Sequence, residues 1–304
     1  MIIDAHQHAF WYGRTDAGLI ADMDECGIDA AWVLTWEIPP DESFVDQGIF
    51  NPLHARTDGT HGGIPLSDAL IMRDHYPQRV IVGYCPDPRL PTACALFESA
   101  VKMHGVRVCG EWKFRMLLDD PRCLNLFRTA GRLGCPVLVH IDVPYLPDKH
   151  GKIAYFKDWY GGTVDNLERA IQACPETVFI GHAPGFWRHI SGDADSSPDV
   201  YPRGPITPGG RVHQLLRTYP NFYADLSAGS GRFALERDLV HAKAFVEEFA
   251  DRLLFGRDWF GQELHQVLQG LELSQQVRDR IYSLNALKLA GRPGEKAPLA
   301  KAKE

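Results

Sequence analysis

Ile2-Ile3-Asp4-Ala5-His6-Gln7-His8 is a short segment with an apolar start that ends in two histidines. Its β-branched beginning predicts a buried strand. Because successive side chains of a strand point to opposite faces, His6 and His8 should lie close together on one face. A dinucleotide-binding fold would carry a G-x-G-x-x-G turn after this strand, and none is present, which disfavours an open doubly wound sheet.

Seven further apolar runs follow along the chain. Their hydrophobicity is nearly continuous rather than alternating, as expected for parallel strands that are covered on both faces. With the first run, the predicted strands are Ile2–His8, Ala30–Trp36, Val80–Cys85, Val106–Phe114, Val137–Ile141, Val178–His182, Phe222–Leu226 and Leu253–Asp258.

The segments between these runs have helical spacing and more charges. The predicted helices are Gly18–Cys26, Ser67–His75, Cys94–His104, Cys123–Leu133, Val164–Ala173, Val212–Thr218 and Ala242–Phe249. Alternating strands and helices form right-handed βαβ units, and eight of them close into a barrel of about 250 residues. We therefore predict an α/β fold, a distorted (β/α)8 TIM barrel that forms one domain over residues 1–290. Residues 291–304 are rich in Lys, Ala, Pro and Gly, which predicts a disordered tail.

Composition excludes several other classes of protein. The 304 residues are 45% hydrophobic and 23% charged, which suits one large core, and the net charge of −7 is spread along the chain. The sequence has no basic stripe of the kind that binds nucleic acid, and no apolar run reaches the ~20 residues that are needed to span a membrane. Seven scattered cysteines without a C-x-x-C motif indicate reduced thiols. We expect a cytoplasmic protein that acts on a small molecule, with a monomer and a homo-oligomer both left open.

Two connections are longer than a barrel requires. They cover about residues 37–65 and 185–210, and each follows a predicted strand. The ends of barrel strands meet at the C-terminal face, so both long loops should lie there. Long loops in compact domains often bind substrate, although an inserted decoration or an oligomer contact is the alternative.

Three more predicted strands end in side chains that can bind a metal: His140, His182 and Asp258. In a barrel these ends converge with His6 and His8 on one rim. A single histidine in an apolar strand is usually a core residue with a satisfied hydrogen bond. Four histidines and an aspartate, all at strand ends, are better explained by one metal site.

The order of motifs resembles the amidohydrolase superfamily, in the amidohydrolase-related group that also contains aminocarboxymuconate-semialdehyde decarboxylase and aromatic-acid decarboxylases. The motifs are Ile3-Asp4-Ala5-His6-Gln7-His8, Val139-His140, Ile180-Gly181-His182-Ala183, Leu254-Phe255-Gly256-Arg257-Asp258-Trp259 and Asn285-Ala286. The resemblance implies that His6, His8, His140 and Asp258 hold the metal. It implies that His182 polarises substrate or water, or binds a second metal; we favour the first role. Asp4 should orient a ligand, because it lies two residues before His6.

The fourth strand departs from the decarboxylase pattern. Glu111 and Lys113 lie two residues apart, and members of the superfamily place a carboxylate or a carboxylated lysine near here to bridge two metals. We favour Glu111 as a ligand, because a carboxylate needs no modification. Lys113 could instead pair with Glu111, contact a substrate carboxylate or stabilise an oxyanion. We expect one metal ion rather than two. If Glu111 is a bridging ligand, the number of ions would be two.

The ligand set predicts the chemistry. A divalent ion lowers the pKa of its water toward ~7, and Asp258 can take up the proton and return it to the leaving group. Zinc fits three histidines and a carboxylate best, with manganese second. The preferred function is hydrolysis of an amide, lactone or ester in a small anionic substrate. Decarboxylation of an aromatic or unsaturated acid, and a non-catalytic barrel with a structural metal, are the alternatives.

Specificity is less clear from the sequence. Arginine binds carboxylates and phosphates in a bidentate manner, so Arg115, Arg203 and Arg257 are candidate substrate clamps, with surface ion pairs as the alternative. Trp112 is a candidate pocket wall, although packing is the commoner role of such an aromatic residue. Residues 225–231 are small and could bind an anion at a helix start, or form a plain turn.

Overall fold

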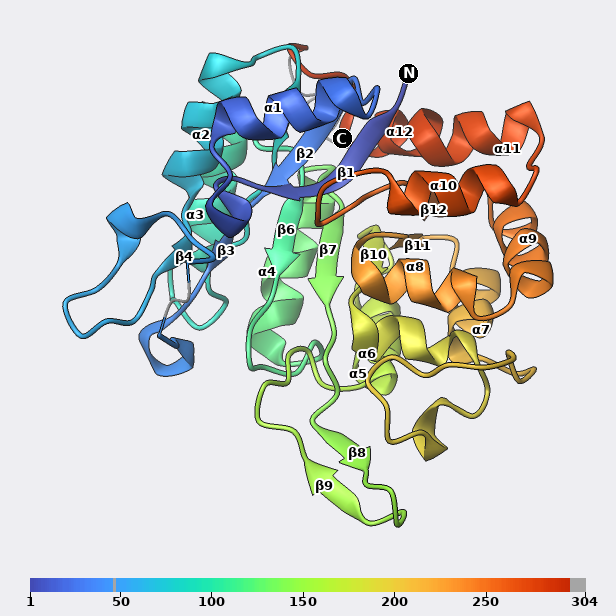
Figure 1. Ribbon diagram of the computed structural model, residues 1–304. Helices are drawn as coiled ribbons and strands as arrows, with labels where there is room; N and C mark the ends of the chain where they lie inside the picture. Colours follow the sequence, from blue (N-terminus) through green and yellow to red (C-terminus); the bar gives the residue numbers. More distant parts are fainter. Residues whose placement is uncertain (46–47, 296–304) are drawn as a thin grey trace.

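The computed structural model describes residues 1–45 and 48–295 and forms the predicted barrel (Figure 1). The predicted tail, 291–304, falls mainly on residues 296–304, which lie outside the described residues. All eight predicted barrel strands are present, several of them shorter than predicted. They are β1 (Ile3–His8), β2 (Ala30–Leu34), β5 (Val80–Val82), β6 (Cys109–Trp112), β7 (Val137–His140), β10 (Phe179–His182), β11 (Phe222–Asp225) and β12 (Leu253–Leu254).

The strands are parallel and close into a ring. Two sheets, β1-β2-β5 and β12-β11-β10-β7-β6, are joined at both edges. A bridge between Gly83 and Val108 links β5 to the start of β6. On the other side, Ala5 N donates to Phe255 O over 2.9 Å and links β1 to the end of β12. The ring is therefore complete, and the carboxyl ends of all eight strands meet at one face.

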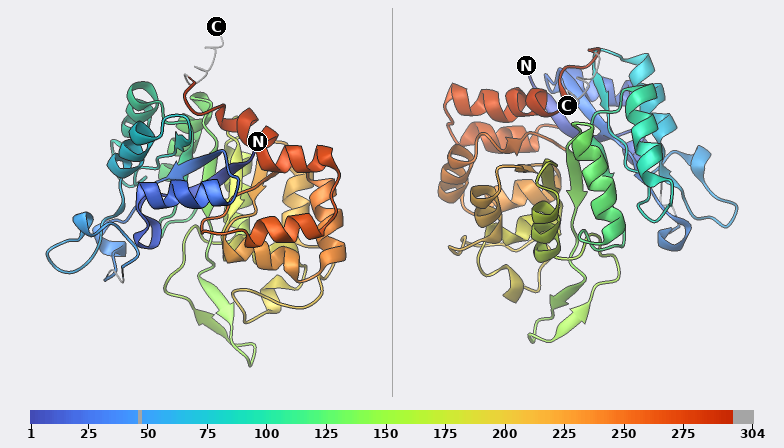
Figure 2. Two further views of the ribbon diagram at one scale, coloured as in Figure 1. Left: turned by 45° about the horizontal axis from the view of Figure 1, so that its top comes forward. Right: turned by 180° about the vertical axis from the view of Figure 1, so that it is seen from behind.

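Helices cover the outside of the ring (Figure 2). The predicted helices correspond to α1 (Asp16–Glu25), α2 (Leu66–His75), α3 (Ala93–His104), α4 (Pro121–Arg132), α5 (Val164–Ala173), α7 (Arg211–Thr218) and α9 (Leu239–Glu248). Not predicted were α6 (Pro184–Trp187), α8 (Ala228–Glu236), α10 (Glu263–Gly270), α11 (Gln275–Asp279) and α12 (Asn285–Ala290). Local signals set several ends: the Asp120 side chain accepts from Arg122 N at the start of α4, and Gly105 ends α3 with a φ of 69°.

The core has two layers that follow the alternation of the strands. Inside the ring lie alternate residues such as Trp32, Leu138 and Ile180, with Ala286 and Ala290 of α12 packed against them at the amino-terminal end. The other strand residues, such as Val33 and Val139, face the helices in a second and larger apolar cluster. This alternation determines which side chains can reach the centre of the barrel.

Two strands break the alternation, and both breaks shape the site. In β1, Asp4 pairs with Ala31 and Gln7 with Val33, so two residues of β1 lie opposite Trp32. In β6, Cys109 pairs with Val137 and Trp112 with Val139, so Gly110 and Glu111 lie opposite Leu138. These irregularities turn His6, His8 and Glu111 inward, and they leave Asp4 and Trp112 on the outer face.

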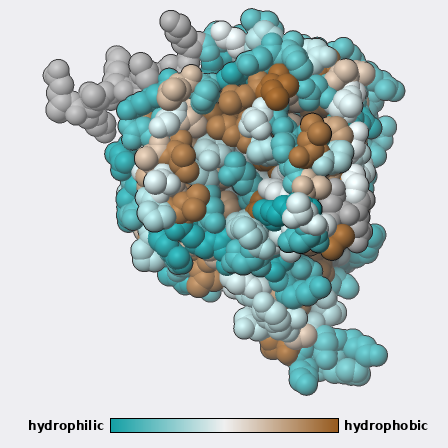
Figure 3. All heavy atoms as spheres, turned by 90° about the vertical axis from the view of Figure 1, so that its left-hand side faces the viewer, coloured by the Kyte–Doolittle hydropathy of each residue, from teal (hydrophilic) through white to brown (hydrophobic). Residues whose placement is uncertain are grey.

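Long connections extend from the carboxyl ends of the strands (Figure 1). The segment after β2 folds back as β3 (Trp36–Glu37) paired with β4 (Gly63–Ile64). The segment after β7 projects as a hairpin, β8 (Tyr145–Pro147) and β9 (Ile153–Tyr155), which the sequence did not indicate. On the face drawn in Figure 3, apolar residues form separate patches among hydrophilic ones. Within the described residues, no helix is both long and apolar enough to cross a bilayer.

Candidate metal centre

Four imidazoles converge at the carboxyl ends of the strands, as the sequence predicted. His6 and His8 come from β1, His140 from β7 and His182 from β10, and all four are buried. The ring centroids of His6 and His182 are 4.3 Å apart, those of His6 and His8 are 5.2 Å apart, and those of His140 and His182 are 5.2 Å apart. Three strands that are distant in sequence thus deliver histidines to one place.

Two carboxylates lie among these rings. Glu111 Oε2 is 3.6 Å from His8 Nε2, while Glu111 Oε1 is 2.6 Å from His140 Nδ1 and 3.7 Å from His182 Nε2. Asp258 Oδ1 is 3.5 Å from His8 Nε2 and 4.0 Å from His6 Nε2, and Asp258 Oδ2 is 3.7 Å from His182 Nε2. Both carboxylates therefore face Nε2 of His8 and Nε2 of His182.

The other nitrogen of every ring is held by an outer acceptor. Asp225, at the end of β11, lies 2.8 Å from His6 Nδ1 and 3.0 Å from His182 Nδ1. His8 Nδ1 is 2.9 Å from the carbonyl oxygen of Leu34, and His140 Nε2 is 2.8 Å from Asp142 Oδ2. Outer acceptors of this kind fix the tautomer of a histidine and turn its remaining lone pair toward a metal.

The inner atoms form two groups that share Glu111. One is His6, His8 and Glu111; the other is Glu111, His140 and His182, and within each group the candidate ligand atoms lie within 4.8 Å of one another. A third such group, His6, His182 and Asp225, connects the two on the side of Asp225. His6 Nε2 and Asp258 Oδ1 are buried and have no hydrogen-bond partner among the described residues. Buried lone pairs that face one another without donors are costly unless a cation lies between them. These residues therefore fit divalent metal ions.

The electrostatics agree with this arrangement. Burial opposes ionisation of Glu111, but His140 and Lys113 hold the pKa of its carboxyl well below the usual range. Burial lowers the pKa of His6, and the charges of Asp258 and Asp225 outweigh that effect and raise it to about 9. Burial dominates at His8 and lowers its pKa to about 4. The site therefore favours positive charge close to the ionised carboxylate of Glu111.

Two predicted substrate contacts lie elsewhere. Arg257 is 5% exposed; its Nε donates to Asp4 Oδ2 over 2.6 Å, and its Nη1 is 2.7 Å from Asp22 Oδ2. It anchors α1 to the barrel and does not point at the site. Trp112 is fully buried against Phe127 of α4 because it is on the outer face of β6. Both predicted contacts were wrong, since alternation directs these side chains away from the centre.

Asp4 also differs from its predicted place. The bulge in β1 puts it on the outer face, where it accepts from Gln7 Nε2 and from the backbone and side chain of Arg257. It bonds to the backbone of His6 and to no imidazole. The carboxylate that orients ligands is Asp225, which the sequence analysis had placed in a possible anion-binding turn. Its Oδ1 instead accepts from Ser227 N at the start of α8.

The remaining predicted residues, Lys113, Arg115 and Arg203, lie against aromatic rings. The ammonium of Lys113 is 3.8 Å from the ring centroid of Trp36, and the guanidinium of Arg115 is 5.9 Å from that of Tyr160. Arg203 is exposed, with its guanidinium 5.6 Å from the ring of Phe233. Lys113 is thus close to the centre, where its charge acts on Glu111 and His140, whereas neither arginine contacts a ligand residue in the described part of the chain.

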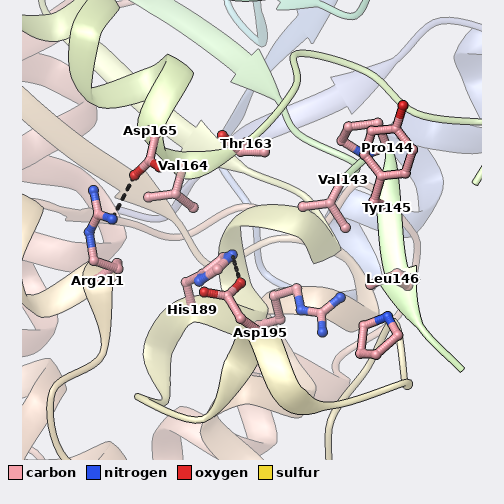
Figure 4. A pocket seen from close by; sticks show the side chains of 12 residues that line it. Val143, Pro144, Tyr145, Leu146, Thr163, Val164, Asp165, His189, Asp195 and Arg211 are labelled. Atoms are coloured by element: carbon pink, nitrogen blue, oxygen red, sulfur yellow. Dashed lines mark hydrogen bonds and ion pairs between the residues drawn. The ribbon is translucent and has the colours of Figure 1, made fainter. Parts of the chain in front are cut away.

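A separate cavity of about 160 Å³ lies under the β8–β9 hairpin (Figure 4). Val143 and Tyr145 face Asp165, Arg211 and His189 across it, and Arg211 is paired with Asp165. None of the four site histidines lines this cavity, so it is distinct from the metal centre.

Comparisons with known proteins agree with the fold. A family model described as amidohydrolase matches residues 3–292, and no curated protein gives a significant match. An amidohydrolase from Burkholderia multivorans with bound zinc superposes with a TM-score of 0.58 at 15% identity, covering 96% of this chain and 100% of that chain. A probable 2-pyrone-4,6-dicarboxylic acid hydrolase from Acinetobacter baumannii superposes with a TM-score of 0.54 at 13% identity. The 2,6-dihydroxybenzoate decarboxylase from Rhizobium superposes with a TM-score of 0.55 at 16% identity. Each of these two matches covers 95% of this chain and 98% of the other chain.

Proposed function

This chain belongs to the amidohydrolase family, and we propose that it is a hydrolase that uses two divalent ions to cleave an amide, lactone or ester bond in a small anionic substrate. One observation carries the proposal: Glu111 is shared by two buried groups of ligands, one on β1 and one on β7 and β10. A carboxylate with two oxygens can bridge neighbouring ions, which is the arrangement of two-metal hydrolytic sites.

The proposal revises two expectations from the sequence. Two ions replace the single ion expected, and His182 becomes a ligand beside His140 instead of a polarising group. The supporting observation is that Asp225 holds Nδ1 of His182 and leaves its Nε2 facing Glu111 and Asp258. We propose zinc before manganese, because imidazole-rich sites suit zinc and a solved amidohydrolase of the same fold contains it.

Ions bound there would lower the pKa of water toward neutrality and polarise a carbonyl group. Asp258 is the group best placed to accept the proton and return it to the leaving group. Its side chain is 16% exposed, whereas that of Glu111 is 2% exposed, so Asp258 lies on the side that a substrate can reach. Its backbone is fixed from both sides, because its N–H donates to His6 O and its carbonyl accepts from Trp11 Nε1.

The first test combines metal content with activity. Elemental analysis of the purified protein should give close to two ions per chain, and His140→Asn should give close to one. His150→Asn, in the exposed turn of the β8–β9 hairpin, is the matched control and should retain both ions. Metal-loaded protein should release protons from a panel of lactones, esters and amides, and Asp258→Asn should abolish that release. One ion in the wild type and in His140→Asn alike would disprove the shared bridge.

Decarboxylation of an aromatic acid is the second candidate, and one observation favours it. The rings of Trp11, Trp36 and Tyr160 lie beside the metal centre and could bind a flat acid. Carbon dioxide release from aromatic carboxylates, without turnover of the hydrolytic panel, would select this function. If neither panel reacts and Asp258→Asn changes only the melting temperature, the ions are structural.

A further inference from the structure

The cavity under the β8–β9 hairpin has both polar and apolar walls (Figure 4). Residues 143–147 form one wall, and the start of α5 forms another together with Arg188 and His189. Its volume of about 160 Å³ exceeds the share of about 30 Å³ that one water takes in the liquid. Tyr145 and Asp195 line the cavity and are exposed. The cavity therefore has room for a small organic molecule and is open to solvent.

Arg188 is a buried cation without a partner carboxylate. It is 4% exposed, and no carboxylate of the described residues lies within ion-pair distance of its guanidinium. Its Nη2 donates to Ala194 O over 2.6 Å and to Ser197 O over 2.7 Å, whereas its Nε is buried and has no hydrogen-bond partner there. The charges of Asp195 and Asp199 act from further away, but burial outweighs them and lowers the pKa of Arg188. A buried charge without a counter-charge is costly unless a ligand supplies one.

His189 is a second buried group without a partner in the same wall. It is 6% exposed, and its ring nitrogens make no hydrogen bond within the described part of the chain. Its Nε2 is 3.8 Å from Asp195 Oδ1, which is beyond hydrogen-bond distance. Burial lowers its pKa to about 4, so the ring is uncharged at neutral pH. A neutral imidazole carries one N–H donor, which is available to a ligand in the cavity.

The other charges around the cavity are balanced or screened. Arg211 Nη1 is 2.7 Å from Asp165 Oδ1, and its Nη2 is 2.6 Å from Glu168 Oε2. The side chain of Asp195 is 95% exposed, so water and salt screen its charge. Among the described residues that line the cavity, Arg188 is thus the cation that lacks a counter-charge. A ligand with a single negative charge would supply it.

The remaining walls indicate what else the ligand carries. Val143, Leu146 and Val164 line the cavity, together with Pro144 and Pro147. Ligand sites commonly combine apolar walls with a few polar groups that fix the orientation of the ligand. An inorganic anion would leave these apolar side chains without a partner. An organic acid with a short chain would cover them while its carboxylate faces Arg188.

We propose that this cavity is a second ligand site, which binds a small organic monocarboxylate with a short apolar chain. Arg188 binds the carboxylate, and the ring N–H of His189 donates to it. The two carbonyl groups that hold Nη2 of Arg188 keep the guanidinium in place before the ligand arrives, which reduces the entropy lost on binding. No histidine of the metal centre lines the cavity, so the proposal does not rest on the proposed function.

Binding of simple probes tests the site. Isothermal titration of the metal-loaded protein uses butyrate, its uncharged analogue butyramide and inorganic phosphate. The wild type should bind butyrate more tightly than both others. Arg188→Met should weaken butyrate binding about 10- to 150-fold, as expected for a charge-assisted hydrogen bond. Arg203→Met, at an exposed arginine outside the cavity, is the matched control and should bind like the wild type. Equal binding of butyrate and butyramide, or no butyrate binding up to about 10 mM, would overturn the proposal.

Two further variants locate the bound carboxylate. Because Arg188 also holds two backbone carbonyl groups, Val143→Phe leaves it in place and fills the cavity instead; it should weaken butyrate binding about tenfold or more. His8→Asn removes a candidate ligand of the metal centre and lies outside the cavity, so it should change butyrate binding less than about threefold. Loss of butyrate binding in His8→Asn, with binding retained in Val143→Phe, would place the carboxylate on the metal ions and refute the second site. Tighter binding of phosphate than of butyrate would refute the organic acid.

Discussion

Asp225 Oδ2 lies 2.8 Å from His6 Nδ1, so a carboxylate at the end of β11 supports a histidine on β1. Its other oxygen does the same for His182 over 3.0 Å. In Asp225→Asn, the side-chain amide nitrogen would face the N–H group of either His6 or His182. A donor would then face a donor, and that histidine would lose its hydrogen bond. We expect metal affinity or activity to fall about 10- to 100-fold, as is typical of such partners. Competition with a chelator measures the affinity, with Asp148→Asn of the hairpin as control. Unchanged affinity and activity would exclude the supporting role.

Glu111→Gln tests the bridge itself. A neutral amide offers one oxygen ligand and cannot satisfy both groups, so metal content should fall from two ions to one or fewer. Activity should fall by more than about 100-fold, because a ligand is lost and not merely an orienting partner. Elemental analysis and turnover of the best panel substrate measure both effects. Glu98→Gln, exposed on α3, should change neither; two ions retained in Glu111→Gln would contradict the bridge.

Most of the barrel was predictable because its strands are long apolar runs between helical segments. The predicted strand ends then placed His6, His8, His140, His182 and Asp258 correctly at one rim, since parallel strands of a barrel share a direction. The β8–β9 hairpin was not predictable. Its residues are mostly exposed and carry little alternation of apolar and polar side chains.

The errors in the site come from the two irregular strands. Counting by twos from His6 put Asp4 on the inner face, but the extra residue in β1 moves it outward. Asp225 was not predicted as a site residue, although it lies one residue before the end of the predicted strand Phe222–Leu226 and is the last residue of β11. That position was the available signal, and only the folded ring shows that its two oxygens reach His6 and His182.

The pH dependence of stability should differ in sign between metal-free and metal-loaded protein. Without metal, Asp258 and Asp225 outweigh burial and raise the pKa of His6 to about 9, from 6.5. The interactions that raise this pKa stabilise the fold fully below about pH 6.5. This stabilisation is lost as the pH rises toward 9. Metal binding must displace this proton, so metal affinity rises over the same range. Thermal unfolding from pH 6.5 to 9 should show a falling melting temperature without metal and a steady or rising one with metal. His6→Asn should flatten the metal-free curve; a metal-free curve that rises with pH would contradict the assignment.

Arg257→Met should destabilise the fold rather than alter substrate binding. It would leave Asp4 buried and uncompensated, and breaking a buried ion pair costs about 3–5 kcal/mol of unfolding free energy. Urea unfolding measures the change. Arg203→Met, at an exposed position, should stay within about 0.5 kcal/mol of the wild type. A raised KM with unchanged stability in Arg257→Met would restore its predicted role as a substrate clamp.

Trp11 should act as a positioning residue for Asp258. Its Nε1 donates to the carbonyl oxygen of Asp258 over 3.0 Å, at a residue whose φ is 47°, and its ring packs on His8. Trp11→Phe keeps an aromatic ring and removes the donor, so we expect kcat to fall about 3- to 10-fold with KM and metal content nearly unchanged. Trp259→Phe, at a tryptophan that is 44% exposed, is the matched control and should behave like the wild type. Because a purely structural role would lower the melting temperature and leave kcat intact, steady-state kinetics and thermal unfolding together decide between the two roles.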